Sequence, residues 1–261
     1  MQESLAPEAR KTLLLGGLLA LTSLLLHSVP FFLFGKHPLG YDTGFYRRYV
    51  IEPLVSFPNT PVPGLGSDAL LPRIVLDTLR FLHLPTDGIL YGAYFVFWAL
   101  VPALLFLFLK PYLQKRGAFI AGILIAFSSV AYMGYWYFLL KNALALDVLL
   151  LACIAIERRW IWLWFFIDIA LVLSHKTSAI IYLLTLGILF VVSHRRRKEL
   201  ALHIALAGFL FTLINAPTVR ELTVVLPSAV FLDWHTYFIL SLPFLIAITL
   251  GVRAFWKYKI P

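Results

Sequence analysis

The residues best suited to chemistry in this sequence are acids, lysines and histidines that stand where apolar runs end. One set is Gly40–Tyr49, GYDTGFYRRY, in which Asp42 is followed by aromatic residues and by Arg47 and Arg48. A carboxylate there could act as a general base toward a hydroxyl or amide, or position an acceptor or a metal. The two arginines could hold a phosphate through charge-assisted hydrogen bonds. Alternatively, Asp42 caps the following helix and the arginines extend to lipid headgroups.

Two further polar sets, Lys141–Asn142 and Ser174–Ser178, also stand where apolar runs end. If each lies at a helix end, free N–H groups and the helix dipole add to the positive side chains and make an oxyanion site. Alternatively, these are ordinary turn residues at a membrane interface. That alternative fits Lys141 better than His175 and Lys176, because two cationic donors in a tight turn are costly unless an anion visits.

A third polar set, Pro217–His235, contains Asp233 and His235. These two side chains could assist proton transfer or hold a metal, although two ligands are too few for a metal site. The alternative is a simple interfacial loop. We therefore name Asp233 and His235 as substrate-binding candidates and name no residue as a metal ligand.

Two acids, Asp147 and Asp168, fall inside apolar runs. A carboxylate at such a position is costly in a membrane and usually faces the interior of a helical bundle. Either acid could belong to a proton relay or contact a substrate. Either could instead be a neutral, hydrogen-bonded packing residue.

The composition excludes a soluble domain, since the mean hydropathy is +0.87 and only 13% of the 261 residues are charged. We predict an all-α polytopic integral membrane protein with about eight transmembrane helices and a single domain over residues 1–261. The lone Cys153 provides neither a disulfide framework nor a thiolate metal site. The predicted helices are Thr12–Phe34, Gly88–Leu109, Gly117–Leu140, Ala143–Ile156, Trp160–Ser174, Thr177–Ser193, Glu199–Ala216 and Thr236–Val252.

Lys and Arg fall mostly on one side of this arrangement, including the run Arg195–Lys198. Because basic loops stay in the cytoplasm, we predict a multi-pass protein of the cell (plasma) membrane with cytoplasmic N- and C-termini. The candidate site residues then lie on the extracytoplasmic face. The net charge of +9 sets this orientation and does not indicate a nucleic-acid partner. The first apolar run is expected to be a retained anchor.

One long extracytoplasmic loop, residues 35–87, is predicted to carry two helices along the membrane surface, Thr43–Phe57 and Ser67–Leu82. The second begins at a plausible N-cap, Ser67 or Asp68, and has an apolar face formed by Leu71, Ile74, Val75, Leu79 and Leu82. Two predicted spans, Ala143–Ile156 and Trp160–Ser174, are short, at roughly 22 Å. They suggest a recessed polar pocket that opens outward.

These features together resemble the polytopic glycosyltransferases of the GT-C class, which use polyprenyl-phosphate-linked sugars. The likeness rests on a long first outside loop with surface helices, on offset helices with outward polar corners, and on a short motif. That motif, Asp-x-x-[Phe/Tyr]-Tyr-Arg, comprises Asp42, Phe45, Tyr46 and Arg47. In this class the first-loop acid is catalytic or positions the acceptor. This chain departs from the class in having fewer spans and no acidic neighbour beside Asp42.

The resemblance implies that Asp42 is the base and that Lys141, His175 and Lys176 bind the lipid phosphate. Arg47, Arg48 and Asn142 complete the set of substrate-binding candidates. The implied partners are a lipid-linked sugar donor, membrane lipids, and a glycan, lipid or protein acceptor. No cofactor is assigned, and a divalent cation, Mg²⁺ or Mn²⁺, is the candidate to consider.

Three alternatives remain open. The segment SHKTSA is similar to a corner of membrane polysaccharide polymerases, which act on related lipid-linked sugars. A carrier or flippase would keep the cationic outer face but needs a path to the cytoplasm, with inverted repeats or broken helices. The small size and the isolated Asp42 instead favour a non-catalytic subunit of a larger complex.

Overall fold

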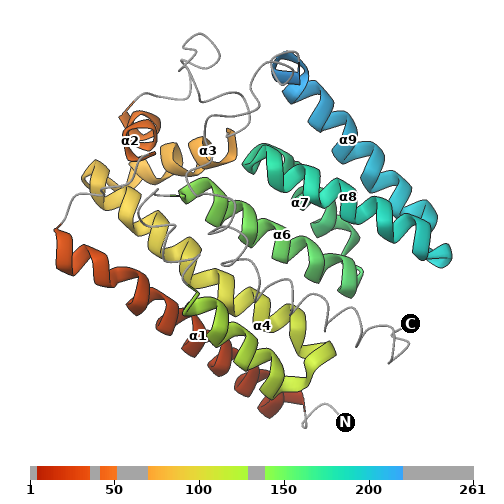
Figure 1. The fold of residues 1–261 in the computed structure, drawn as a ribbon, viewed down its shortest axis with the longest axis horizontal. Coiled ribbons are helices and arrows are strands. Elements are labelled where there is room, and N and C mark those ends of the chain that lie inside the picture. Colours follow the sequence, from red (N-terminus) through yellow and green to blue (C-terminus); the bar gives the residue numbers. More distant parts are fainter. Residues whose placement is uncertain (1–4, 36–41, 52–69, 129–138, 220–261) are drawn as a thin grey trace, which may run out of the picture. The chain divides into compact units, whose positions relative to one another are not determined.

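The computed structural model describes residues 5–35, 42–51, 70–128 and 139–219, and all regular structure in these ranges is helical. The chain divides into two compact units, residues 1–217 and 218–261. The all-α class is confirmed. The helices are α1 (Leu5–Phe34), α2 (Thr43–Ile51), α3 (Leu70–Leu79), α4 (Thr86–Ala126), α6 (Leu140–Arg158), α7 (Ile161–Ser174), α8 (Lys176–Val192) and α9 (Arg197–Val219), with 3₁₀ turns at Arg80–Leu82 and His194–Arg196 (Figure 1).

Two of the described helical segments, Pro7–Leu33 and Thr86–Ala126, are long and apolar enough to cross a membrane. A third candidate is the pair Lys176–Val192 and His194–Leu213, which is bent by 111°. The apolar helices therefore indicate a membrane protein. The count of about eight spans stays a prediction, and the predicted helix Thr236–Val252 lies outside the described residues.

Helix α4 consists of two arms that meet at Gln114, whose φ of 58° and ψ of 172° are not helical. The arms fold back on one another, since a Cβ placed on Gly122 would lie 3.1 Å from the carbonyl oxygen of Pro102. The second arm ends at Ala126, and the next described helix, α6, begins at Leu140. The predicted continuous helix Gly117–Leu140 is therefore wrong. The apolar composition continued past Ala126 and concealed the end of the helix.

The contact at Gly122 gives a test of this hairpin. A methyl group there would lie 2.7 Å from Cδ1 of Leu19 as well as against the Pro102 carbonyl, which cannot move aside like a side chain. We expect Gly122→Ala to lower the free energy of unfolding by about 1–3 kcal/mol in detergent. The control is Gly187→Ala, since nothing lies within 4 Å of a Cβ at Gly187. Equal stability of the two variants would contradict the hairpin packing.

Many large apolar side chains point away from the helical interior. Trp162 is 83% exposed, and Phe166 and Leu184 are each 64% exposed. In α7 the buried positions, by contrast, recur at helical spacing and form one face: Trp164, Ile167, Asp168, Leu171 and Val172. Apolar surface of this extent is unfavourable in water and suits contact with lipid tails.

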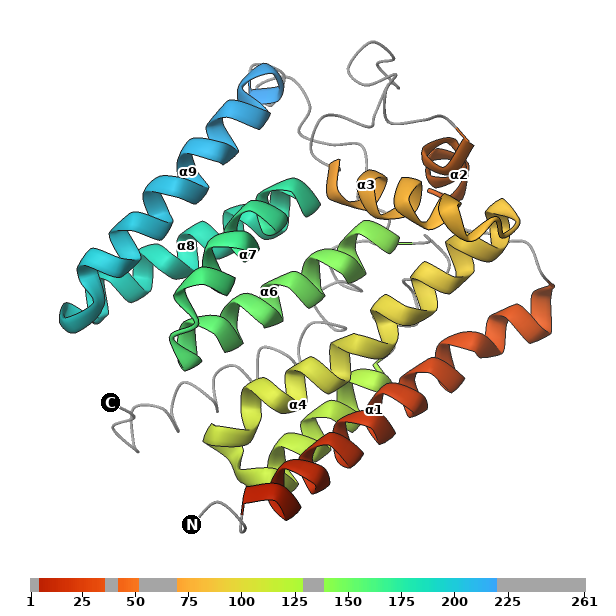
Figure 2. The ribbon, with the colours of Figure 1, turned by 180° about the vertical axis from the view of Figure 1, so that it is seen from behind.

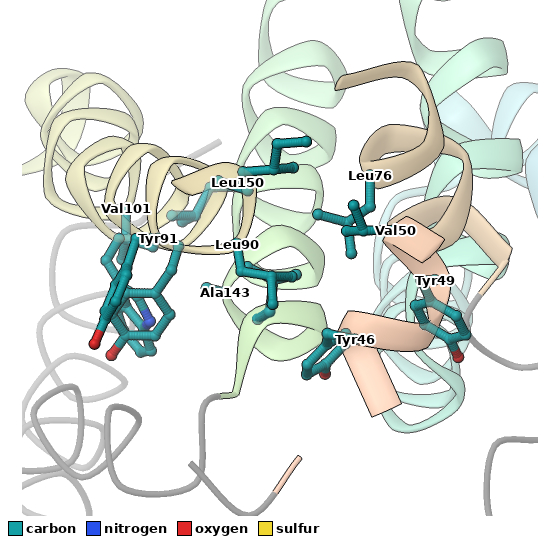
Figure 3. Packing of buried hydrophobic residues seen from close by; sticks show 14 residues of the cluster. Tyr46, Tyr49, Val50, Leu76, Leu90, Tyr91, Val101, Ala143 and Leu150 are labelled. Carbon is teal, nitrogen blue, oxygen red and sulfur yellow. The ribbon is translucent and has the colours of Figure 1, made fainter. Parts of the chain in front are cut away.

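The short helices α2 and α3 pack together over the beginnings of α4 and α6. In Figure 3, Val50 of α2 and Leu76 of α3 approach one another, and Tyr46 lies near the first turn of α6. Leu76 is fully buried. Helices are present in the described parts of both predicted segments, and the second passes into a 3₁₀ turn at Arg80–Leu82. The remainders of the two predictions, with the proposed N-caps Ser67 and Asp68, fall on residues 52–69, outside the described ranges.

The opposite end of the bundle collects segments predicted to be cytoplasmic. The Glu8 carboxylate lies 2.7 Å from Nζ of Lys115, and Lys110 Nζ donates a hydrogen bond to Thr12 Oγ1 at 2.8 Å. These contacts join the beginning of α1 to the bend of α4 (Figure 2). The Arg196 guanidinium likewise donates to the carbonyl of Ile156 near the end of α6. Basic residues from separate segments thus contact the ends of other helices. The side of the membrane on which they lie stays a prediction.

Candidate functional site

Asp42 and Lys141, far apart in the sequence, approach one another where Tyr46 of α2 reaches the beginning of α6. The carbonyl oxygen of Asp42 accepts a hydrogen bond from Tyr46 N–H at 3.2 Å, which places Asp42 at the start of α2. The buried hydroxyl of Tyr46 in turn accepts a hydrogen bond from the backbone N–H of Lys141 at 3.2 Å. That N–H belongs to the first turn of α6, where helical partners are lacking. The fold therefore brings together two of the predicted site residues.

The charge of Asp42 is set by two opposing effects. The side chain is half-buried, and this burial raises the pKa of its carboxyl above the ordinary value. The ammonium group of Lys141 lowers the same pKa and offsets part of that shift. A carboxylate poised in this way accepts protons more readily than an exposed aspartate.

Arg47, predicted to bind phosphate, makes a two-pronged ion pair with Asp87 at the beginning of α4. Its Nε donates to Oδ1 of Asp87 at 2.8 Å, and a terminal nitrogen donates to Oδ2 at 3.1 Å. This pairing raises the pKa of the Arg47 guanidinium. Arg47 therefore links α2 to the beginning of α4, close to Asp42 at the start of α2. Arg48, the neighbouring candidate, is exposed.

Variants of this ion pair can distinguish a structural role of Arg47 from a role in phosphate binding. We expect Arg47→Gln and Asp87→Asn each to weaken the link between α2 and α4, with a coupling of about 1 kcal/mol in a double-mutant cycle of unfolding. If Arg47 serves only to link α2 to α4, the two variants should lose the same amount of stability and should affect phosphate-headgroup binding equally. A selective loss of phosphate-headgroup binding in Arg47→Gln, with Asp87→Asn unaffected, would instead assign Arg47 to the ligand.

Arg73 of α3 is a cation in this region that sequence reasoning missed. It is only 5% exposed, and its guanidinium carbon lies 5.7 Å from the ring centroid of Tyr49. The buried face of α3 comprises Pro72, Arg73 and Leu76, whereas the predicted apolar face included Leu82, which is 59% exposed. The available signal was the three-residue spacing of Arg73 and Leu76, which places both on one helix face.

The second predicted corner lies between α7 and α8. His175 has an extended backbone and precedes α8; its carbonyl oxygen accepts the N–H of Ala179 at 3.0 Å. Nδ1 of His175 lies 3.3 Å from Oγ of Ser178, and Lys176 is the first residue of α8. Helix α3 contacts α2 on one side and α7 on the other, so it lies between the two corners (Figure 1).

Only one of the two helices predicted to be short is short. Helix α7 has 14 residues, as expected, but α6 has 19, because it begins at Leu140 and not at Ala143. Lys141 and Asn142 therefore belong to its first turn. The Asn142 Oδ1 atom and both carboxylate oxygens of Asp147 are buried without a hydrogen-bond partner among the described residues. These acceptors remain available to donors from outside that part of the chain.

Asp168, the other predicted intramembrane acid, belongs to a buried polar network across α7, α8 and α9. The Tyr182 hydroxyl donates to its Oδ1 at 2.5 Å, and Nδ1 of His203 lies 2.5 Å from its Oδ2. Trp164 Nε1–H donates to the Tyr182 oxygen, and the rings of Trp164 and His203 stack with centroids 3.3 Å apart. Sequence reasoning named Asp168 but missed Tyr182 and His203.

The remaining candidates, Asp233 and His235, lie outside the described residues. Within the described ranges, no three His, Cys, Asp or Glu side chains gather into a metal site. Compared with known proteins, the chain matches no family model, no curated protein and no solved structure.

Proposed function

We propose that this chain is a membrane glycosyltransferase that takes a sugar from a polyprenyl-phosphate or polyprenyl-diphosphate donor on the extracytoplasmic face. The observation that carries the proposal is a half-buried Asp42 close enough to Lys141 for the ammonium group to lower its pKa. The backbone N–H of Lys141, in the first turn of α6, donates a hydrogen bond to the Tyr46 hydroxyl of α2. A carboxylate next to a cation, at a helix beginning, suits a reaction in which one group takes a proton while another receives negative charge.

In the proposed step, Asp42 accepts the proton of an acceptor hydroxyl or amide, whose oxygen or nitrogen attacks the anomeric carbon of the sugar. The bond between that carbon and the phosphate oxygen breaks, and the lipid phosphate leaves with the electron pair. Lys141, and His175 with Lys176 across α3, are assigned to the developing phosphate charge, where fixed positive groups help most. Arg48, Asn142, Asp233 and His235 stay candidates for binding the substrates.

The proposal includes the membrane arrangement. About eight spans would place both termini and the basic segments in the cytoplasm, with α2, α3 and the two polar corners outside. The grouping of Lys110 and Lys115 with Glu8, at the end of α1 away from Asp42, supports this arrangement. Cysteine labelling of single-cysteine variants in intact cells tests it, with Cys153 replaced by Ala to remove the background.

The deciding experiment measures glycosyl transfer in membranes from a panel of radiolabelled polyprenyl-phosphate sugars. The parent chain is compared with Asp42→Asn and with Asp77→Asn, a matched control that removes a carboxylate of α3 paired only with the helix neighbour Arg80 among the contacts shown. Transfer that Asp42→Asn alone abolishes supports the proposal. Donor binding without transfer by the parent chain would indicate a carrier or a non-catalytic subunit. Extension of a preformed glycan chain would favour the polymerase-like alternative.

A further inference from the structure

The network around Asp168 is independent of the proposed outer site, and its hydrogen-bond directions can be assigned. An indole N–H only donates, so the Tyr182 oxygen accepts from Trp164 and its own proton points to Oδ1 of Asp168. Oδ2 of Asp168 then accepts from Nδ1–H of His203. A neutral His203 is thereby fixed as the Nδ1–H tautomer, with the lone pair on Nε2.

Nε2 of His203 is buried and has no hydrogen-bond partner among the described residues. His203 is 2% exposed and Asp168 is fully buried. A neutral ring leaves an acceptor without a donor, which is unfavourable. A protonated ring leaves an N–H without an acceptor but gains the Asp168 carboxylate and the face of the Trp164 ring. Nδ1–H donates to Asp168 in both states and Nε2 lacks a partner in both, so the network can accommodate either state of the ring.

The neighbouring charged and titratable groups lie mainly toward one end of the bundle. Glu199 stands one turn before His203 on α9 and interacts with it electrostatically, and Arg196 makes two hydrogen bonds to Glu199. Arg196 also lies over the Trp164 ring at 5.7 Å. Arg159 from the α6–α7 turn interacts with Glu199, and Cys153 of α6 with Tyr182. Glu199 favours a protonated His203, while Arg196 and Arg159 oppose it.

Among the described residues, the network is open toward Arg196 and Glu199. Glu199 and Arg196 have partly exposed side chains, at 23% and 20%. Glu199 lies about one helical turn from His203 and Arg196 about two turns, and one or two water molecules can bridge the shorter of these intervals. In the other direction the chain of hydrogen bonds ends at Trp164, whose N–H does not accept a proton. A proton arriving from the Glu199 end therefore has no onward route along the hydrogen bonds that join the described residues of this network.

We propose that Asp168 and His203 form a buried proton-binding site, with Nε2 of His203 as the atom that takes the proton and the Arg196–Glu199 end as its entrance among the described residues. The site binds and releases a proton without passing it through the bundle. A membrane-buried acid and histidine commonly serve proton-coupled functions, and this one joins α7 to α9. Binding a proton converts that junction from a hydrogen bond between a neutral imidazole and a carboxylate into an ion pair.

The first test is ¹⁵N NMR of the full chain, labelled at histidine and held in nanodiscs, over pH of about 5 to 9. His203→Gln identifies the His203 signals among the 7 histidines. We expect Nε2 of His203 to change from unprotonated to protonated as the pH falls, with Nδ1 protonated throughout. Asp168→Asn should move that transition down by about one pH unit or more. Glu199→Gln, at the partly exposed rim where the fold is least disturbed, should move it down by a smaller amount.

The entrance is tested in proteoliposomes of known orientation by Trp fluorescence, since a protonated imidazole stacked on Trp164 should quench its emission. A pH step on the Arg196 side should change the signal, a step on the opposite side should not, and Trp164→Phe should remove the change. The proposal is overturned if His203 keeps one charge state over the whole range. It is also overturned if neither Asp168→Asn nor Glu199→Gln moves the transition, or if steps on both sides act equally.

Discussion

Replacing Asp42 by asparagine is expected to reduce glycosyl transfer by about 10²–10⁴-fold while leaving the protein folded. The same change should slightly stabilise the protein at neutral pH, because the ionised Asp42 is half-buried and its pKa is raised. A carboxyl whose folded pKa is raised stabilises the folded state below its unfolded pKa and loses that contribution as the pH rises. Asparagine removes the cost of the charge that remains at neutral pH.

The pH profile gives the same prediction a second measurement. As the pH falls through the raised pKa of Asp42, the base becomes protonated and transfer should decline at a pH above that expected for an exposed aspartate. Lys141→Met removes the cation that lowers this pKa, so the acidic limb should move to higher pH. A profile that Lys141→Met leaves unchanged would contradict the coupling of the two residues. Tm in detergent, compared with Asp77→Asn, separates loss of function from loss of fold.

Replacing Asp168 by alanine should have the largest effect on stability, a loss of roughly 2–4 kcal/mol in the free energy of unfolding. The carboxylate satisfies both the Tyr182 hydroxyl and Nδ1 of His203, and its removal leaves two buried donors unpaired. The substitution also removes the hydrogen bond that links α7 to α9. Unfolding in mixed detergent and SDS micelles measures the loss.

Two comparisons define this second prediction. Tyr182→Phe removes one of the two hydrogen bonds to Asp168 and should cost about half as much. Asp77→Ala removes a partly exposed carboxylate, paired with Arg80 three residues along the helix, and should change stability by less than about 1 kcal/mol. If Asp168→Ala were no more harmful than Asp77→Ala, the network would have no role in holding the helices together.

The sequence allowed the helices to be found but not all of their ends. Apolar runs predicted α1, α7 and α8 to within a few residues at most boundaries, apart from the N-terminal extension of α1 to Leu5, because an unbroken apolar surface admits only a helix in lipid. The same uniform composition made the prediction of helix ends fail at Ala126 and at Leu140. There the hydrophobic composition continues on both sides of a helix end, so neither periodicity nor hydropathy changes.

The candidate site was predictable only in part. Asp42 and Lys141 were named from residue type and position, and the fold places them together through Tyr46. The partner of Arg47 was not predictable, because Asp87 is 40 residues away and nothing local distinguishes an arginine that binds phosphate from one that fastens two helices. His203 was missed because a single histidine within an apolar run gives no sign of its partner.

The sequence by itself determined an all-helical, strongly apolar chain with its polar chemistry concentrated at helix ends, because burying so much apolar surface and every backbone polar group leaves few other solutions. Only the tertiary structure decided which polar groups meet. It paired Asp168 with His203 and Arg47 with Asp87, and it brought Asp42 within electrostatic reach of Lys141. Such pairs depend on helix rotation and on where each helix begins, and an error of one residue turns a side chain by about 100° around its helix.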